Sequence, residues 1–353
     1  MKPALFIGPW NIGSINQIEK NGLKVFSCFH CGGGSTMGYK LAGYEVLGGV
    51  EIDKEMMAIY RANHKPRHSY HMGVQEFKDL PNLPAELYEL DILDGSPPCS
   101  AFSTAGKRDE KWGVETYFRE GQEKQRLDDL FFHFIDIAAK LQPKVVVAEN
   151  VKGLIIGKAK GYVKQIFHAF HDAGYHCQLF LFNASRMGVP QARERTFFIA
   201  IRNDMDCQKV AMNFAEHVIT AGEALDGVPD ESQKAVWLTE HSRKLWERIR
   251  PGQCFADVHP KGSRFTEVKL DPARPAHTQL SIGQTTHFSQ PRRLTGAEAI
   301  RLQTFPDDYN RLDQDMRYVC GMSVPPFMMQ RVALEIGRQV FGIDYDHTRR
   351  TLA

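Results

Sequence analysis

A cysteine behind two prolines is the residue of this 353-residue chain best placed to act as a nucleophile. Cys99 follows Pro97 and Pro98, which come directly after a predicted strand at 90–93. Proline has a fixed φ and no N–H to donate, so the pair stiffens the turn that presents Cys99. Open α/β sheets keep their reactive groups at the carboxyl ends of strands, and the thiolate is the nucleophilic form of cysteine. The position suits a reactive thiol, but a buried cysteine beside a proline turn explains Cys99 taken alone at least as well.

Further along the chain, an acidic residue and two arginines also lie next to predicted strands. Glu149 follows the apolar run 145–148, so its carboxyl group is expected at the same sheet edge as Cys99. Arg193 and Arg195 lead into another predicted strand, and residues two apart in an extended chain share one face. An acid and two arginines are therefore expected near the Cys99 turn.

A glycine-rich loop indicates a cofactor site. Residues 29–34, Phe-His-Cys-Gly-Gly-Gly, follow the first predicted strand and let a ligand approach the backbone closely. Glu51 ends the second predicted strand, where a ribose-binding acid stands in nucleotide-binding sheets. The loop, the acid, the Cys99 turn and the Glu149 segment each follow a strand, and together they form a strong signal.

The elements that position these residues alternate between strand and helix. Strands are expected at 23–29, 46–52 and 144–148, and helices from after the glycine cluster at 32–34 to about 42, at 130–141 and at 327–340. This alternation predicts an α/β fold with a doubly wound, mostly parallel sheet. Residues 203–290 lack a sustained period and are richer in Gly, Pro, His and charge. We therefore expect a catalytic and cofactor domain from 1–202 plus 291–353, and a second, smaller domain at 203–290.

Charge points to one region that could bind phosphates. The net charge is only +2, but residues 241–301 carry eleven Lys and Arg against five Asp and Glu. Such a segment can form a phosphate-facing surface, with Arg243, Lys244 and Arg248 as candidates. An ordinary solvated face balanced elsewhere explains the composition equally well.

Composition excludes several classes of protein. No apolar run is long enough to span a bilayer, and the first residues lack a signal-peptide pattern. Seven scattered cysteines indicate reduced thiols in a cytosol. We expect no metal site, because the Cys28/Cys31 pair lacks a second pair and the histidines at 64, 68 and 71 lack a partner acid.

Taken together, these motifs resemble those of DNA cytosine-5 methyltransferases. The resemblance spans roughly residues 25–200 and 291–340. It is carried by the loop at 29–34, Glu51-Ile52-Asp53, Pro97-Pro98-Cys99, Ala101-Phe102-Ser103-x-x-Gly106, Glu149-Asn150-Val151, Gln191-x-Arg193-x-Arg195, Arg292-Arg293-Leu294-Thr295, Leu302-Gln303-x-Phe305-Pro306 and Val324-Pro325-Pro326.

The resemblance implies a Rossmann-like methyltransferase fold and a role for each catalytic residue. Cys99 would add to C6 of a flipped-out cytosine, and Glu149 would protonate N3. Arg195 would bind O2, and Arg193 would support the pocket. The cofactor would be S-adenosylmethionine, held by Phe29, Cys31, Gly32, Gly33, Gly34, Glu51, Ile52, Pro97 and Val324, with Ile52 lying on the adenine.

The resemblance also implies double-stranded DNA as the partner. Residues 100–125 would close over the DNA, the alternative being a disordered charged surface loop, and residues 203–290 would recognise the target sequence. A cognate restriction endonuclease is a further candidate partner, and an orphan enzyme is equally compatible with the sequence. DNA contacts are expected from Ser100, Ser103, Lys107, Arg108, Arg243, Lys244 and Arg248. The protein would be a monomer without a membrane segment, in the cytoplasm of a bacterium or an archaeon or encoded by a phage.

Four residues depart from the family pattern. Cys31 replaces the first glycine of the cofactor loop, Gly73 an acid near the adenine, Ser100 a glutamine, and Met322 an asparagine. Two alternatives therefore stay open. One is an RNA cytosine-5 methyltransferase of the transfer-RNA type, and the other is a catalytically silent DNA-binding homologue.

Overall fold

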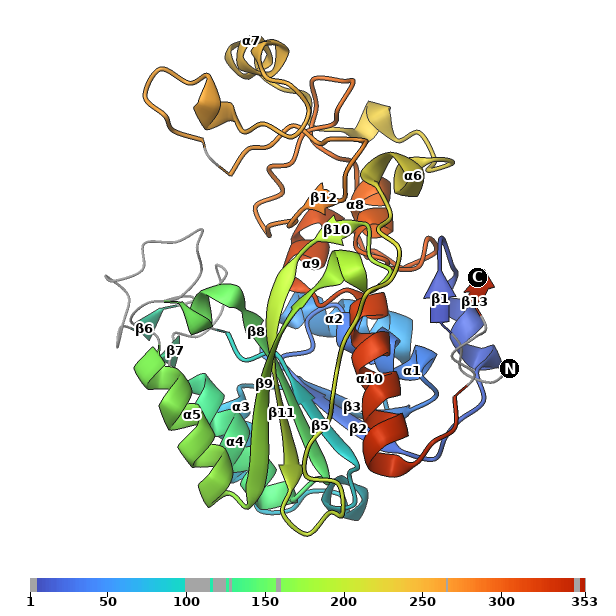
Figure 1. Cartoon of the computed structure of the whole chain (residues 1–353), viewed down its shortest axis with the longest axis vertical. Coiled ribbons are helices and arrows are strands. Elements are labelled where there is room, and N and C mark those ends of the chain that lie inside the picture. The colour runs from blue at the N-terminus through green and yellow to red at the C-terminus, as the bar shows by residue number, and fades with distance from the viewer. Residues whose placement is uncertain are drawn as a thin grey trace.

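A seven-stranded sheet forms the centre of the molecule (Figure 1). The computed structural model describes residues 5–98, 115–116, 125–126, 129–156, 160–264, 266–345 and 350–352. The strands lie in the order β4 (His68–His71), β3 (Glu45–Glu51), β2 (Lys24–Cys28), β5 (Ile92–Gly95), β8 (Val145–Val151), β11 (Glu194–Arg202) and β9 (Tyr175–Asn183). The first five are mutually parallel, and β11 is antiparallel to both of its neighbours. The predicted α/β fold with a mostly parallel sheet is confirmed.

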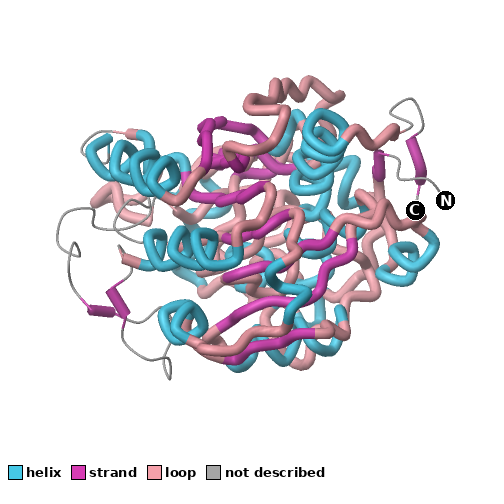
Figure 2. Tube along the Cα trace, turned by 90° about the horizontal axis from the view of Figure 1, so that it is seen from below, coloured by secondary structure: helices cyan, strands magenta, loops and turns pink. Residues whose placement is uncertain are grey.

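Helices cover both faces of this sheet, as Figures 1 and 2 show. One face packs against α1 (Gly34–Leu41), α2 (Lys54–His64) and α10 (Pro326–Phe341). The other packs against α3 (Val74–Asp79), α4 (Leu130–Leu141) and α5 (Lys160–Asp172). Alternate residues of β8 belong to the two cores, with Val145 and Val147 in the first and Val146 and Ala148 in the second. This explains why β8 reads as an unbroken apolar run.

Local signals in the sequence set the ends of several helices. The Asp53 side chain accepts hydrogen bonds from the amides of Glu55 and Met56 and so caps α2. Thr295 and Glu298 form the predicted capping box at the start of α8 (Gly296–Leu302). Helix α10 begins with Pro326 at its first position, which proline tolerates because the N–H there has no helical partner.

Shorter elements complete the chain. β1 (Leu5–Ile7) pairs in parallel with β13 (Arg350–Leu352), which places segments from the two ends of the chain side by side (Figure 1). β6 (Glu115–Thr116) pairs with β7 (Gln125–Arg126), and β10 (Gln191–Ala192) with β12 (Ala276–His277). Helix α9 (Met316–Met322) precedes α10. None of the described helices is long and apolar enough to cross a membrane.

Most of the region 203–290, including α6 (Ala221–Leu225) and α7 (Glu240–Arg248), lies beyond the carboxyl ends of the parallel strands (Figure 1). These helices belong to two small apolar clusters, separate from the cores on the sheet faces. The chain at 205–214 still packs against the sheet, where Val210 is buried. Arg331 of α10 fixes the end of this stretch by an ion pair with Glu216 at 2.9 Å.

Candidate active site

The carboxyl ends of β2, β5 and β8 meet at one edge of the sheet. Their registers place Cys28 beside Gly95 and Gly95 beside Ala148. The next residues of the three strands therefore lead into the glycine-rich loop, the Pro97–Pro98 turn and Glu149. This juxtaposition follows from parallel pairing, and it agrees with the position expected from the sequence.

Glu149 and Arg195 form a nearly buried ion pair at this edge. The Nε of Arg195 lies 3.0 Å from Oε1 of Glu149, and their side chains are 12% and 9% exposed. Strand β11 brings them together, because its antiparallel register sets Arg195 opposite Val151. Burial lowers the pKa of the Arg195 guanidinium below its ordinary value, and the Glu149 carboxylate counteracts that shift. The pair places a positive charge and a carboxyl group side by side at the carboxyl end of β8.

Arg193 lies beside this pair but uses its guanidinium differently. Its two terminal nitrogens donate to the carbonyl oxygens of Gln279, at 3.1 Å, and Gly321, at 3.0 Å. The side chain is buried, which lowers its pKa to about 9, with Arg195 adding to the shift, so it stays protonated at neutral pH. Arg193 thus links the loop at 279 to the end of α9, as a supporting residue would.

Asn150 holds the proline turn. Its side-chain amide donates to the carbonyl oxygen of Pro97 at 3.0 Å, and its own carbonyl accepts the Thr196 hydroxyl at 3.1 Å. In the sequence, Asn150 stood out only as the middle residue of Glu149-Asn150-Val151, and this position predicted no role for it. Cys99, Ser100, Ser103, Lys107 and Arg108 lie outside the described residues.

Several residues of the glycine-rich loop have left-handed backbone conformations, and the Glu51 side chain accepts a hydrogen bond from the loop. Phe29, Cys31 and Gly33 have φ angles of 57°, 47° and 81°. Cys31 holds its strained conformation where glycine would be relaxed, and its amide donates to Oε2 of Glu51 at 2.9 Å. The amide of Asp53 donates to Oε1 at 3.0 Å. Burial raises the pKa of Glu51 to about 7 despite these hydrogen bonds.

Distant segments pack directly on the glycines of this loop. A Cβ on Gly34 would lie 2.0 Å from the carbonyl oxygen of Val324, and one on Gly32 would lie 2.5 Å from Cγ1 of Val319. The Tyr309 hydroxyl donates to the carbonyl oxygen of Gly32. Beside them, the buried Oγ of Ser323 has no hydrogen-bond partner in the described part of the chain. Close backbone, an acid at the end of β3 and an unsatisfied hydroxyl fit a nucleoside cofactor.

Sequence reasoning did not identify a network of buried glutamines that joins these parts. The Gln191 amide donates to Oε1 of Gln303 at 2.7 Å, and Gln303 donates to the carbonyl oxygen of Ser323 at 2.7 Å. Gln191 also accepts the amide of Gln279 at 2.9 Å. Two of these glutamines lie in family motifs, but their partners are far away in the sequence.

The basic segment is largely neutralised within the fold. Glu267 pairs with both Arg264 and Arg293, and Glu298 pairs with Arg292. The candidate phosphate-binding residues lie on the exposed face of α7, where Arg243 and Lys244 form intrahelical pairs with Glu247 at 3.5 Å and Glu240 at 2.8 Å. The free positive charge of this region is therefore smaller than its composition suggests.

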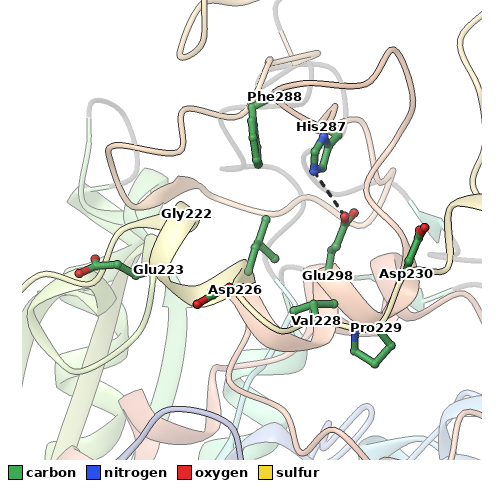
Figure 3. Close-up of a pocket in the computed structure, with 10 residues that line it drawn as sticks. Gly222, Glu223, Asp226, Val228, Pro229, Asp230, His287, Phe288 and Glu298 are labelled. Atoms are coloured by element: carbon green, nitrogen blue, oxygen red, sulfur yellow. Dashed lines mark ion pairs between the residues drawn. The ribbon is translucent and has the colours of Figure 1, made fainter.

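A pocket of about 520 Å³ also lies in this region. Figure 3 shows Glu223, Asp226 and Asp230 around it, with the Glu298 carboxylate directed at His287, 3.6 Å away. Its acidic lining disfavours a phosphate backbone at this place. Within the described parts of the chain, no cluster of three His, Cys, Asp or Glu side chains could hold a metal ion.

Comparison with known proteins relates this arrangement to one family. A family model described as "C-5 cytosine-specific DNA methylase" matches residues 23–338. The type II methyltransferase M.FnuDI of Fusobacterium nucleatum is 33% identical, over 89% of this chain and 94% of that protein. M.NgoFVII of Neisseria gonorrhoeae is 28% identical, over 95% and 91%.

Solved structures share the fold. A putative DNA modification methyltransferase from an E. coli prophage aligns with a TM-score of 0.70 and 22% identity, over 91% of this chain and all of that one. A Spodoptera frugiperda DNMT2 variant aligns with a TM-score of 0.62 and 17% identity, over 88% and 98%. With its family model extending over nearly the whole chain, this protein belongs to the C-5 cytosine-specific DNA methylase family.

Proposed function

We propose that this protein methylates C5 of a flipped-out cytosine in duplex DNA through a covalent bond between Cys99 and C6 of the base. The enzyme is a DNA cytosine-5 methyltransferase that uses S-adenosylmethionine. The observation that supports the mechanism best is the buried Glu149–Arg195 pair, which shares a sheet edge with the Pro97–Pro98 turn and the glycine-rich loop.

Each step can be assigned to a residue of this chain. The Cys99 thiolate forms a bond to C6, and protonated Glu149 gives its proton to N3, so that C5 becomes nucleophilic. Arg195 stabilises the negative charge that gathers on O2 and keeps Glu149 in place. Bound S-adenosylmethionine supplies the methyl group. Loss of the C5 proton to a base, return of the N3 proton to Glu149 and departure of Cys99 as thiolate restore the enzyme.

Two further residues act by positioning these groups. Asn150 fixes the turn that carries Cys99 through its bond to Pro97. Arg193 joins the loop at 279 to Gly321, next to the cofactor loop and the base pocket. Neither side chain needs to touch the reacting atoms.

For the cofactor we propose contacts from the loop Phe29–Gly34, Glu51, Ile52, Pro97 and Val324. Both oxygens of Glu51 already accept backbone amides, and each keeps a lone pair for a ribose hydroxyl. Met322 is half-buried beside the unsatisfied Ser323 hydroxyl, where its thioether offers no donor.

For the DNA we propose two surfaces around the catalytic edge. Residues 203–290 form the smaller, target-recognition domain, and the catalytic domain comprises 1–202 and 291–353. The exposed Arg243, Lys244 and Arg248 contact phosphates from α7, and Ser100, Ser103, Lys107 and Arg108 approach from the loop after Cys99.

We also propose that the protein is the monomeric modification enzyme of a type II restriction system in a bacterial cytoplasm. Its relatives M.FnuDI and M.NgoFVII are type II methyltransferases from bacteria. A cognate endonuclease would then cut the sequence that this enzyme protects.

Bisulfite sequencing of DNA from cells that express the chain tests the proposal. We expect 5-methylcytosine at one short recurring sequence, and resistance of that DNA to an endonuclease of the same specificity. Unmodified DNA, together with methylated transfer RNA from the same cells, would contradict it.

A further inference from the structure

Asp94 is a buried acid beneath the catalytic edge to which the proposed mechanism assigns no role. It is the last residue but one of β5 and is 1% exposed. Its carboxylate accepts the Ser27 hydroxyl at 2.7 Å and the Tyr39 hydroxyl at 3.3 Å. Buried carboxylates usually pair with a base. Among the described residues, the charged group that acts on Asp94 is another acid, Glu149.

The sheet register defines where this carboxylate lies. Asp94 is paired with Ser27 on one side and Val147 on the other. Glu149 follows Val147 by two residues in β8, so Asp94 and Glu149 share the face of the sheet that α1 covers. Tyr39 belongs to α1, which begins immediately after the glycine-rich loop. Asp94 therefore lies between the cofactor loop and the catalytic carboxyl group.

Asp94 lies on the strand between the proposed cofactor site and the proposed base site. Strand β5 separates β2, which carries the cofactor loop, from β8, which carries Glu149. A methyl group that passes from cofactor to cytosine must cross the carboxyl end of β5. S-adenosylmethionine carries a positive charge on its sulfur, whereas its product S-adenosylhomocysteine has a neutral thioether.

An ionised Asp94 carboxylate, buried without a base, destabilises the free enzyme. Burial raises the pKa of Asp94 to about 7, and Glu149 raises it too, while the hydroxyls of Ser27 and Tyr39 act in the opposite sense. A positive ligand would offset that cost because it replaces the missing base.

We propose that Asp94 is the counter-charge for the cofactor's sulfonium and makes the site prefer S-adenosylmethionine to S-adenosylhomocysteine. The inference rests on the cofactor site proposed above and adds a selectivity residue to it. A preference for the charged cofactor favours exchange of product for substrate after each turnover.

Calorimetry with Asp94→Asn tests this with three ligands. Asparagine keeps the size of the side chain and removes its charge. We expect S-adenosylmethionine and sinefungin, which carries an amine in place of the sulfonium methyl, to bind about tenfold more weakly, a scale typical of opposite charges in a partly buried site. Binding of S-adenosylhomocysteine should stay unchanged.

A neighbouring acid provides a matched control. Asp91 is also buried, but it precedes β5 at the opposite edge of the sheet, where it pairs with Lys144 at 2.8 Å. Asp91→Asn should leave the ratio of the two affinities as in the parent. An equal loss for all three ligands in Asp94→Asn would overturn the inference, because it would show a structural role alone. Failure of the parent to bind any of them would instead refute the cofactor site.

Two measurements of pH dependence extend the test, and the second uses the parent alone, so it stays decisive if the variant folds poorly. Because burial raises the pKa of the folded Asp94 carboxyl to about 7, the parent loses stability as pH rises from the ordinary carboxyl range to about 7. Asp94→Asn should therefore raise the unfolding temperature more at pH 8 than at pH 5.5.

In the parent, the preference for S-adenosylmethionine should increase over the same rise in pH. Glu51 also titrates near 7, but it would contact the ribose common to both ligands and so leaves their ratio unaffected. Ser27, Ser35, Tyr39 and Glu149 act on Asp94 directly, and Asp94 in turn influences Cys28, on the other face of the sheet, and Tyr60. Glu149→Gln, which removes the other acid, should retain the increase, and a ratio independent of pH would contradict the inference.

Discussion

Replacing Gly34 by alanine should damage the fold and the cofactor site together. The new Cβ would lie 2.0 Å from the carbonyl oxygen of Val324 and 3.2 Å from Cβ of Ser323. The atom that the new Cβ would meet is a backbone carbonyl oxygen, so no flexible side chain can move aside. The segment before α10 would have to retreat by more than an ångström from the loop that it supports.

The size of the effect follows from the cost of overpacking. Such insertions destabilise by about 1–3 kcal/mol, and a contact between two backbones belongs near the upper limit. With an unfolding entropy of about 2 cal/mol/K per residue, about 3 kcal/mol lowers the unfolding temperature of this chain by about 4 °C. Because the displaced loop would face the cofactor, S-adenosylmethionine should bind at least about tenfold more weakly, or about 1.4 kcal/mol.

Gly161→Ala is the matched control. Gly161 is the second residue of α5, and a Cβ there would meet nothing within 4 Å. Alanine is favoured over glycine in helices by about 0.5–1 kcal/mol, so this variant should be slightly more stable and bind the cofactor normally. Differential scanning calorimetry and titration calorimetry measure both quantities. If Gly34→Ala matched the parent in both, the idea that the glycines are needed for close packing would be wrong.

The remaining predictions concern the acid, the turn and the DNA surface. Glu51→Ala should weaken S-adenosylmethionine binding by about 1–3 kcal/mol in titration calorimetry. Since burial raises the pKa of Glu51 to about 7, the parent should bind both cofactor and product less well as pH falls below 7, and Glu51→Gln should abolish that dependence. Asn150→Ala removes the hydrogen bond to Pro97 and should lower kcat, with a smaller loss of cofactor affinity through the Pro97 contact; an unchanged kcat would argue against a role in the turn. Neutralising the three exposed charges of α7, Arg243, Lys244 and Arg248, should weaken binding to every DNA sequence. The slope of the logarithm of the binding constant against the logarithm of salt concentration should fall by about 0.9 for each phosphate that the variant no longer neutralises. An unchanged slope would exclude α7 from the interface.

The sheet and its reactive edge could be predicted because local signals determine them. An apolar run followed by an acid, as at 145–149, indicates a buried parallel strand and its carboxyl end. Parallel strands then bring Glu149, Glu51 and the proline turn to one edge without any knowledge of distant contacts. The capping box at Thr295 could also be predicted from the sequence, since its two residues lie within one helical turn.

Partners far away in the sequence could not be predicted. The positive charges between 241 and 301 suggested a phosphate surface, yet Glu267 and Glu298 neutralise three of the arginines. Arg193 and Arg195 look equivalent two residues apart, but one binds backbone carbonyls and the other binds Glu149. Asp94 lies inside a strand that its neighbours mark as apolar, and only the register reveals the acid that faces it.

A covalent trap at Cys99 tests the central claim most directly. Duplex DNA with 5-fluorocytosine at the target position should form a complex with the parent enzyme and S-adenosylmethionine that survives denaturation, because fluorine cannot leave C5 as a proton does. Cys99→Ala should bind the same DNA and form no such complex. A denaturation-resistant complex with Cys99→Ala, or methyl transfer by that variant at the parent's rate, would contradict the assignment of Cys99 as the nucleophile.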